Sequence, residues 1–353
     1  MLIEISSHGT FIGKKGQAIK ITCRGEKLQE VPVVKLSEII VSASASISSE
    51  AVKLLAENGV PVLFMGGGKP IALLHGFFMH GTVLTRREQI TAYGDHRGTH
   101  LAKTFVDAGM TNKHRLINYF ANSRKRTDPT LADHLEAATQ EIKRVQEKLS
   151  EINNGLITEK RYEIMGLEAE ATRIYYQALR LILPEEIRFQ RREKRPPRDP
   201  FNSALSLGYT ILNSRVLAAV TACGLEPFAG FLHADRSGKA SLVLDLSEEF
   251  RQPLVDRTAV SMFTQGTLTP KDFEHTEGRL LFSDDAKKKY IEAILSRLES
   301  EAKPDEGKAP LENMIFHQAR EIARYLLGKA QSYTPYTFEW WGTTGGGGDN
   351  QND

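Results

Sequence analysis

The sequence predicts an α+β protein, with a small, mostly-β N-terminal domain followed by a larger α-helical domain. Over the first 85 residues, short aliphatic and β-branched runs alternate with polar residues and are separated by Gly, Lys and Ser turns. After Arg86, apolar residues recur every three or four positions instead, which is the spacing of amphipathic helices. The length of 353 residues exceeds what one compact core usually holds, so it also favours two domains.

In the N-terminal domain we expect short strands around one helix. The strand-like runs lie at 2–5, 18–22, 31–34, 39–41, 60–64 and 71–74, and the glycines at 66–68 favour a tight reversal before the last run. The helix is expected from Ser49 to Leu55, because a hydroxyl and an early acid open it and Gly59 ends it.

The second domain is expected to be largely helical from residue 100 onward. The periodic stretches lie at 101–120, 131–152, 160–182, 200–223, 248–264, 284–301 and 310–331, with a surface loop at 303–308. We therefore divide the chain into an N-terminal β domain at 1–85, a linker at 86–99, a helical domain at 100–341 and a tail at 342–353. The tail is made of Gly, Thr, Asn, Gln and Asp with nothing to bury, so it is expected to be disordered.

Composition excludes several classes of protein. Hydrophobic residues make up 41% and charged residues 25%, which is unlike a disordered chain, a fibrous repeat or a disulfide-stapled domain. Cys23 and Cys223 cannot build a zinc ribbon. The apolar runs are far shorter than the roughly 18 residues of a membrane span, and no secretion leader is recognisable. We expect no membrane association and a cytoplasmic location.

Positive charge is concentrated locally, although the net charge is only +2. Six basic residues and one acid lie between Arg188 and Arg198. A second basic group comprises Lys113, Arg115, Arg124, Lys125 and Arg126. Contacts with phosphate are short-range and screened within roughly 8 Å, so such local groups matter more to a polyanion than the total charge.

Glu168 is the first candidate for a functional carboxylate. In the predicted helix it lies beside the apolar stripe, on one flank with Thr172 and Tyr175. A carboxylate in that position is half-buried and requires a partner. A purely structural role is the alternative.

His233 and two acids after it form the second candidate group. His233 follows a loop broken by Gly224, Pro227 and Gly230, although a lone histidine after an apolar pair is also typical of a packed core. Asp245 lies in a predicted strand at 241–246.

Glu248 follows that strand, at the predicted start of the next helix, where an acid can simply complement the helix dipole. A turn after His233 can bring Asp245 or Glu248 back beside the imidazole. One histidine with carboxylates suits Mn²⁺ or Mg²⁺, which activates water or a hydroxyl on a phosphodiester. The sequence contains no GxxxxGK[ST], HExxH or GxSxG motif.

These residues carry a resemblance to the CRISPR-associated protein 1 family, the metal-dependent integrase of CRISPR adaptation. The most specific matching segments are 195–209, 224–227, 230–233 and 244–251, and the likeness extends from the β domain to the last helix. The family's order of glutamate, histidine and acid falls on Glu168, His233 and Glu248, with Asp245 as second choice. Relatives often have aspartate in place of Glu248.

The resemblance implies a helical catalytic domain and a β domain that forms homodimers, two of which flank a dimer of CRISPR-associated protein 2. The three ligands would bind Mg²⁺ or Mn²⁺. The substrates would be double-stranded fragments with 3′-hydroxyl ends, the CRISPR leader-repeat and branched DNA. The hydroxyls attack phosphodiesters without ATP. The basic residues that would contact DNA are Arg191, Arg192, Arg195, Arg198 and Arg236, the last near the scissile position.

Three other interpretations fit the same residues. The chain can be a repair nuclease for branched DNA or a mobile-element integrase of the same superfamily. It can also be a DNA-bridging scaffold without activity, but retention of all three candidate ligands argues against this.

Overall fold

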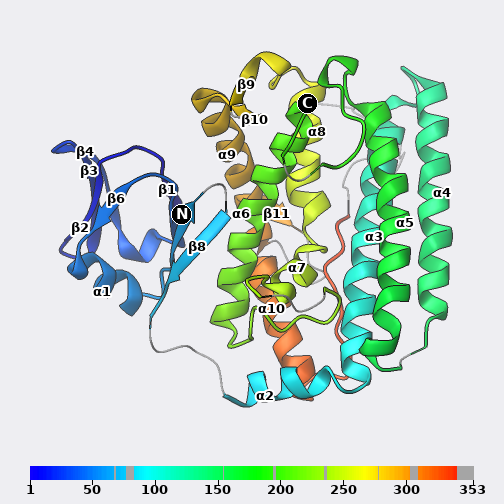
Figure 1. Cartoon of the computed structure of the whole chain (residues 1–353), viewed down its shortest axis with the longest axis horizontal. Helices are drawn as coiled ribbons and strands as arrows, with labels where there is room; N and C mark the ends of the chain where they lie inside the picture. The colour runs from blue at the N-terminus through cyan, green and yellow to red at the C-terminus, as the bar shows by residue number, and fades with distance from the viewer. Residues whose placement is uncertain are drawn as a thin grey trace, which may run out of the picture.

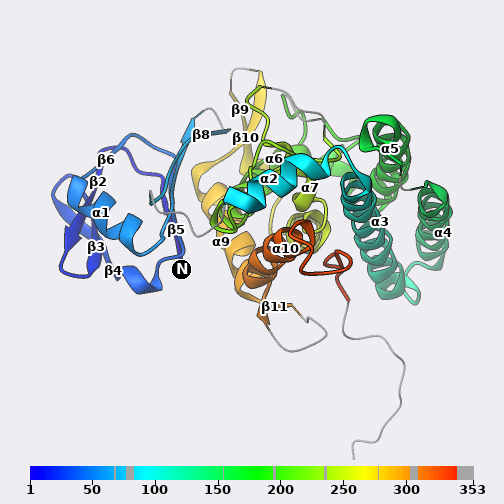
Figure 2. The same ribbon diagram turned by 90° about the horizontal axis from the view of Figure 1, so that it is seen from below.

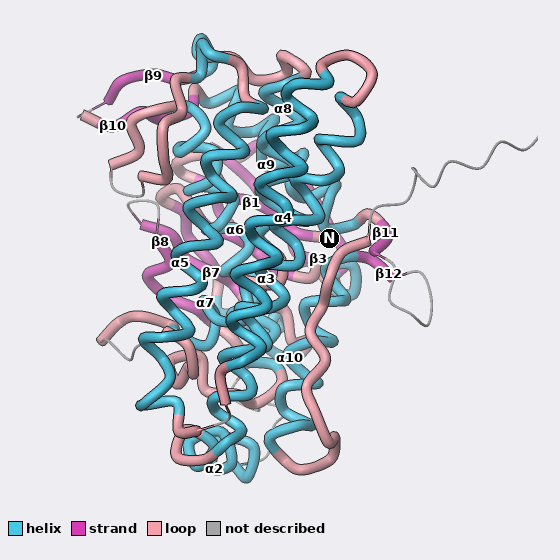
Figure 3. Tube along the Cα trace, turned by 90° about the vertical axis from the view of Figure 1, so that its right-hand side faces the viewer, coloured by secondary structure: helices cyan, strands magenta, loops and turns pink. Residues whose placement is uncertain are grey.

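A computed structural model describes residues 1–66, 69–76, 83–153, 155–193, 196–233, 237–276, 278–302 and 309–339. The strands of the N-terminal region gather on one side of the molecule and the long helices on the other (Figure 1). From the helical side, the helices lie in front of the N-terminal strands (Figure 3). This arrangement confirms the predicted α+β class.

The N-terminal domain contains two four-stranded sheets. The first has the order β1 (Leu2–Ile5), β5 (Glu38–Val41), β7 (Val62–Gly66) and β8 (Lys69–Leu74), with only the β7–β8 pair antiparallel. The second has the order β4 (Glu26–Pro32), β3 (Ala18–Cys23), β2 (Thr10–Lys15) and β6 (Ala45–Ile47). Helix α1 (Ser49–Glu57) begins after Ser48, whose hydroxyl accepts from the amide of Ala51. The strands β2 and β6 were not predicted, and the run at 31–34 ends β4 and turns into a 3₁₀ helix.

Among its described residues, the helical region contains ten further α- or π-helical segments, two 3₁₀ helices, η2 (Glu185–Ile187) and η4 (Pro270–Asp272), and two short hairpins. The long helices are α2 (Val83–Ala92), α3 (His96–Arg124), α4 (Pro129–Glu151), α5 (Ile157–Ile182), α6 (Pro200–Ala222), α9 (Asp284–Glu299) and α10 (Leu311–Leu326). The shorter ones are α7 (Ser241–Ser247), the π-helical η3 (Arg251–Asp256) and α8 (Arg257–Thr264). The hairpins are β9 (Phe273–Thr276) with β10 (Arg279–Phe282), and β11 (Glu301–Ala302) with β12 (Ala309–Pro310).

Helices α3, α4 and α5 pack side by side at the edge farthest from the β domain (Figure 2). Their buried faces include Leu101 and Phe105 of α3, Leu135 of α4 and Ile164 of α5. The predicted helices at 131–152, 160–182, 200–223, 284–301 and 310–331 are confirmed within five residues at either end. The predicted loop at 303–308 and the tail at 342–353 lie outside the described residues.

The predicted linker at 86–99 is wrong, because most of it is helical. Helix α2 occupies 83–92, at one end of the helical region beside α10 (Figure 1), and α3 begins at His96. Gln89 is buried and its amide donates to the carbonyls of Glu226 and Ala229, at 2.9 and 2.7 Å. These bonds fix the segment to the helical core.

The predicted strand at 241–246 is also wrong, since these residues form helix α7. A strand would bury Leu242, Leu244 and Leu246 together, whereas the helix buries Val243 and Asp245 and leaves Leu244 half-buried. Glu248 consequently follows the end of a helix rather than opening one. The predicted helix at 248–264 is interrupted by η3, where Pro253 has no amide for an α-helical bond.

A buried charge cluster, here called the interdomain cluster, joins the two parts of the chain. It consists of Glu38 on β5, Arg215 on α6 and Glu312 on α10. Arg215 Nη1 lies 2.9 Å from Glu38 Oε2 and 3.3 Å from Glu312 Oε1. Burial raises the pKa of Glu38 to about 7; Arg215 opposes the shift and Glu312 adds to it. One guanidinium therefore forms ion pairs with two carboxylates at the domain boundary.

Candidate metal centre

Two of the three predicted ligands converge on one ammonium group. Lys113 Nζ, from α3, lies 3.8 Å from Glu168 Oε1 on α5 and 3.9 Å from Glu248 Oε2 after α7. The side chains of Lys113 and Glu248 are only 4% and 2% exposed, whereas that of Glu168 is 24% exposed. We call these three residues the carboxylate site. Distant segments thus bring two carboxylates to one cation.

Glu168 is half-buried, as its helix position predicted. The hydroxyl of Thr172, one turn later, donates to Glu168 Oε1 at 2.7 Å. Glu170, two residues away on α5, instead lies 3.7 Å from Lys148 of α4. The two neighbouring glutamates therefore point to different surroundings.

Glu248 is held by a second cation at its other oxygen. The guanidinium of Arg251 donates to Glu248 Oε1, and it lies over the ring of Tyr209 at 5.3 Å. Burial alone would lower the pKa of Arg251, but the carboxylates of Glu248 and Glu168 and two tyrosines outweigh it, so the net shift is upward. Arg251 thus keeps its charge in a buried place and fixes the carboxylate of Glu248.

His233 forms a pair with Asp245 of α7. The imidazole Nδ1 lies 2.7 Å from Asp245 Oδ1, which also accepts the amide of His233 at 3.0 Å. Asp245 Oδ2 accepts the amides of Phe231 and Leu232 at 2.6 and 3.0 Å. A histidine bonded to a carboxylate through one nitrogen is oriented to use the other, here Nε2, towards a metal or a proton.

Gly230 allows this loop to approach α7. A Cβ there would lie 2.7 Å from the backbone carbon of Ser241 and 2.8 Å from Asp245 Oδ2, so a side chain would force the two apart. Gly230 is therefore needed for Asp245 to accept hydrogen bonds from the backbone amides of Phe231, Leu232 and His233.

Neither Asp245 nor Glu249 is placed as well as Glu248 to serve as a ligand. Asp245 is fully buried and both of its oxygens accept hydrogen bonds. Glu249, also fully buried, accepts from the hydroxyl of Tyr333 at 2.5 Å and the amide of Tyr336 at 2.8 Å. Burial raises the pKa of Glu249 to about 8, although both of these hydrogen bonds act to lower it.

The complete set of three ligands stays a prediction. Within the described parts of the chain, no three His, Cys, Asp or Glu side chains lie close enough together to hold a metal ion. The structure instead brings Glu168 and Glu248 to Lys113 and ties His233 to Asp245, on the short helix that Glu248 follows.

Sequence reasoning assigned Lys113 to a basic group and missed its place in the site. The available signal was its position in α3, where it continues a buried row with Val106, Met110 and Ile117. A lysine in an apolar row requires a buried counter-charge.

A buried aspartate with tyrosines beside the carboxylate site was also missed. Asp256 accepts from the hydroxyls of Tyr209 at 2.6 Å and Tyr175 at 2.8 Å. Burial raises the pKa of Asp256 to about 6, while the two hydroxyls, Arg251 and Lys113 act in the opposite direction. This network lies below the guanidinium that contacts Glu248.

Comparisons with known proteins identify the family of the chain. A family model described as "CRISPR associated protein Cas1" matches residues 3–295. The chain belongs to this family. It is similar to "CRISPR-associated endonuclease Cas1 1" of Archaeoglobus fulgidus, with 33% identity over 346 residues, covering 96% of this chain and 100% of the relative. It is also similar to "CRISPR-associated endonuclease Cas1" of Korarchaeum cryptofilum, with 32% identity over 343 residues, covering 94% and 96%.

Solved structures share the Cas1 fold along nearly the whole chain. One titled "Casposase bound to integration product" has a TM-score of 0.79 at 24% identity, covering 96% of this chain and 94% of that one. A CAS1 protein from Thermotoga maritima has a TM-score of 0.77 at 20% identity, covering 96% and 99%. These two likenesses establish the architecture. Every described helix is too short or too polar to cross a membrane.

The basic residues expected to contact DNA in this Cas1 family member divide into two kinds. Arg191 and Arg198 are 81% and 76% exposed, and both lie near Glu193, at 3.2 and 3.8 Å. Arg192 instead donates to Asn202 Oδ1 at 2.9 Å, and its guanidinium stacks on a tyrosine ring. Arg195 and Arg236 lie outside the described residues.

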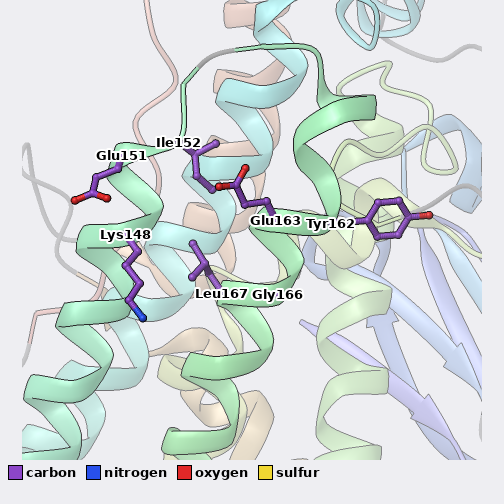
Figure 4. A pocket seen from close by; sticks show the side chains of 7 residues that line it. All are labelled: Lys148, Glu151, Ile152, Tyr162, Glu163, Gly166 and Leu167. Carbon is purple, nitrogen blue, oxygen red and sulfur yellow. The ribbon is translucent and has the colours of Figure 1, made fainter.

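Two hollows on the surface of the Cas1 fold lie apart from the carboxylate site. One of about 510 Å³, between the end of α4 and the start of α5, is lined by Lys148, Glu151, Ile152, Tyr162, Glu163, Gly166 and Leu167 (Figure 4). Another of about 300 Å³ lies between α3 and α4, where burial, Lys143 and Arg115 lower the pKa of His114 to about 4. Glu168 and Glu248 line neither hollow.

Proposed function

We propose that the protein is a divalent-metal-dependent DNA endonuclease and integrase that inserts short DNA fragments into a CRISPR array. The observation that carries the proposal is the convergence of Glu168 and Glu248 on one cation. Membership of the Cas1 family over residues 3–295, with relatives named as endonucleases, supports it.

The residues fit a divalent cation. Two carboxylates already face one positive charge, and His233 offers Nε2 from a ring that Asp245 orients. We propose that Glu168, His233 and Glu248 hold Mg²⁺ or Mn²⁺. When bound, the ion neutralises the charge that develops on the phosphate and polarises the attacking hydroxyl. An imidazole ligand favours Mn²⁺ over Mg²⁺, so Mn²⁺ is expected to bind more strongly in vitro.

The proposed reaction is a transesterification. The 3′-hydroxyl oxygen of the fragment forms a bond to phosphorus and loses its proton, while the bond to the departing 3′ oxygen of the target strand breaks. One phosphodiester replaces another, so ATP is not required. In this chain Arg251 contacts Glu248 and Asp245 contacts His233. The exposed Arg191 and Arg198 would contact the DNA backbone.

The proposed assembly follows the family. Two homodimers formed through the β domain would flank a dimer of CRISPR-associated protein 2. A solved structure that shares the fold of this chain is titled "Cas6-RT-Cas1--Cas2 complex", and another is titled "Crystal structure of TtCas1-DNA complex". Their titles support a partner protein and DNA as binding partners.

A half-site integration assay on a leader-repeat duplex tests this function. With a labelled fragment carrying a 3′-hydroxyl, His233→Ala, Glu168→Gln and Glu248→Gln are expected to lose at least about 10²-fold of the metal-dependent product. Glu170→Gln is the matched control, since Glu170 faces Lys148 on the same helix. Full integration by His233→Ala, or by wild type without divalent ions, would refute the proposal.

The same assay separates the related functions. A repair nuclease would cut branched DNA without joining fragments to the leader-repeat, and a mobile-element integrase would require the inverted-repeat ends of its own element. Joining only of such ends would replace the CRISPR assignment while leaving the proposed ligands in place.

A further inference from the structure

Lys113 lies between the carboxylates of two of the proposed metal ligands. Its ammonium faces Glu168 Oε1 and Glu248 Oε2, while Arg251 contacts the other oxygen of Glu248. Thr172 donates to Glu168 Oε1 from within α5. The two oxygens that face Lys113 lie on different segments, one on α5 and one after α7. The ammonium lies within 4 Å of both.

The two distances indicate a shared rather than a fixed contact. Charge-assisted hydrogen bonds of an ammonium to a carboxylate are typically about 2.7–2.9 Å long. At 3.8 and 3.9 Å, Lys113 stays between the two carboxylates without a short bond to either. Its side chain is nevertheless almost completely buried, which without counter-charges would be costly.

We propose that Lys113 is a positioning residue that substitutes for the divalent ion. In the metal-free protein it keeps the carboxylates of Glu168 and Glu248 from repelling each other, and it gives way when the ion binds. The site is thereby assembled before metal arrives, and metal affinity is lowered because the ion competes with a resident charge. This inference rests on the proposed metal-dependent function.

Replacement of Lys113 should change stability and metal affinity in opposite directions. Lys113→Met removes the ammonium that lies within 4 Å of both carboxylates, so the metal-free protein is expected to melt at a lower temperature. The same variant is expected to bind Mn²⁺ about tenfold more tightly, because no ammonium competes with the ion. Saturating Mn²⁺ should then raise its melting temperature more than that of wild type.

The experiment uses the full-length protein after removal of metal with a chelator. Calorimetric titration with Mn²⁺ gives the affinity, and thermal unfolding with and without Mn²⁺ gives the stability. Lys103→Met is the matched control, since Lys103 on the same helix donates to the carbonyl of Ile152 instead. It is expected to alter stability but leave Mn²⁺ affinity unchanged.

Lys113→Arg keeps the test decisive if Lys113→Met fails to fold, and a double variant adds a second test if it folds. Lys113→Arg retains the charge, and its planar guanidinium can bind carboxylates through two hydrogen bonds. It is therefore expected to fold, and to bind Mn²⁺ more weakly than wild type because the ion must displace a more firmly held cation. In the metal-free protein, the melting-temperature losses of Lys113→Met and Glu168→Gln are expected to be non-additive in the double variant.

Unchanged or weaker Mn²⁺ affinity in folded Lys113→Met would overturn the inference, as would unchanged affinity in Lys113→Arg or additive losses in the double variant. If wild type and every variant fail to bind Mn²⁺, the proposed metal-dependent function is refuted. The metal-free double variant then decides alone whether Lys113 joins the two carboxylates.

Discussion

The interdomain cluster and the carboxylate site each place one basic side chain between two carboxylates, yet they differ in how firmly that charge is held. Arg215 contacts its two acids at 2.9 and 3.3 Å, whereas Lys113 lies 3.8 and 3.9 Å from its own. Burial does not distinguish the clusters, since each pairs a buried acid (Glu38 or Glu248) with a partly exposed one, Glu312 at 19% or Glu168 at 24%.

The difference indicates which cluster can exchange its cation. In the interdomain cluster both acids lie close to the same guanidinium nitrogen, Arg215 Nη1, and nearer to it than either acid of the carboxylate site lies to Lys113 Nζ. Lys113 makes no short bond to either acid, and this longer contact is the basis of our proposal that an ion can replace it. If this proposal holds, the same charge pattern forms a permanent contact at the domain boundary and an exchangeable site within the helical region.

The sharpest test of this comparison removes the shared cation from the interdomain cluster. Arg215→Met leaves the buried Glu38 and the half-buried Glu312 without their shared cation, so it is expected to lower the free energy of unfolding by about 3–5 kcal/mol. Lys113→Met is expected to cost less and to recover in Mn²⁺, whereas no ion should rescue Arg215→Met. Urea unfolding with and without Mn²⁺ measures both. Equal losses in the two variants would abolish the distinction.

A second test concerns the pH dependence of stability. The pKa of Glu38 is raised from its usual 4.5 to about 7, so the folded chain holds a proton there that the unfolded chain releases. Its stabilising contribution is complete below pH 4.5, falls as pH rises towards 7, and is lost above it, a change of about 3 kcal/mol.

Glu38→Gln is expected to remove this slope, because glutamine does not titrate and Arg215 keeps Glu312 as counter-charge. Urea unfolding at pH values from 4.5 to 8 measures the change. Glu50→Gln, at an exposed acid paired with Lys53, is the control and should keep the wild-type slope. A slope equal to wild type in Glu38→Gln would show that its carboxylate is already ionised in the folded protein across this range.

A third test separates orientation from ligation within the helical region. Asp245→Ala leaves the amides at 231–233 and the ring of His233 without their acceptor, so it is expected to cost about 1–3 kcal/mol and to reduce strand transfer. Its Mn²⁺ affinity should remain largely unchanged. Glu248→Ala is expected to abolish both Mn²⁺ binding and strand transfer. If Asp245→Ala loses the ion and Glu248→Ala keeps it, the assignment of the ligand is wrong.

The sequence predicted the long helices because their apolar periodicity extends over many turns, as in α4 with Leu135, Ile142 and Leu149. It misassigned α7 because seven residues cannot distinguish a period of two from a helical one. Leu242, Leu244 and Leu246 fit a strand equally well, and only the packing of Asp245 against the loop at 230–233 decides for a helix.

The candidate site was predictable in its acids and its histidine but not in its basic partners. Glu168 and Glu248 stood out by position and resemblance, whereas Lys113 is one of 46 basic residues in the chain. Its contact with both acids requires α3, α5 and the segment after α7 to meet, and no local pattern specifies that meeting. The same holds for Arg215, whose partners lie on β5 and α10.

The smallest expected effect on stability concerns basic residues that lie outside both clusters. Arg191 and Arg198 are exposed and share one acid, so replacing both by Ala should change the free energy of unfolding by less than about 0.5 kcal/mol. DNA affinity should fall, and its salt dependence should flatten by about one unit of slope for each lost phosphate contact. Arg192→Ala is the matched contrast, since it loses the bond to Asn202 and is expected to destabilise the fold instead. Binding measured at several salt concentrations decides: an unchanged affinity and slope in the double variant would mean that these arginines are only solvated surface.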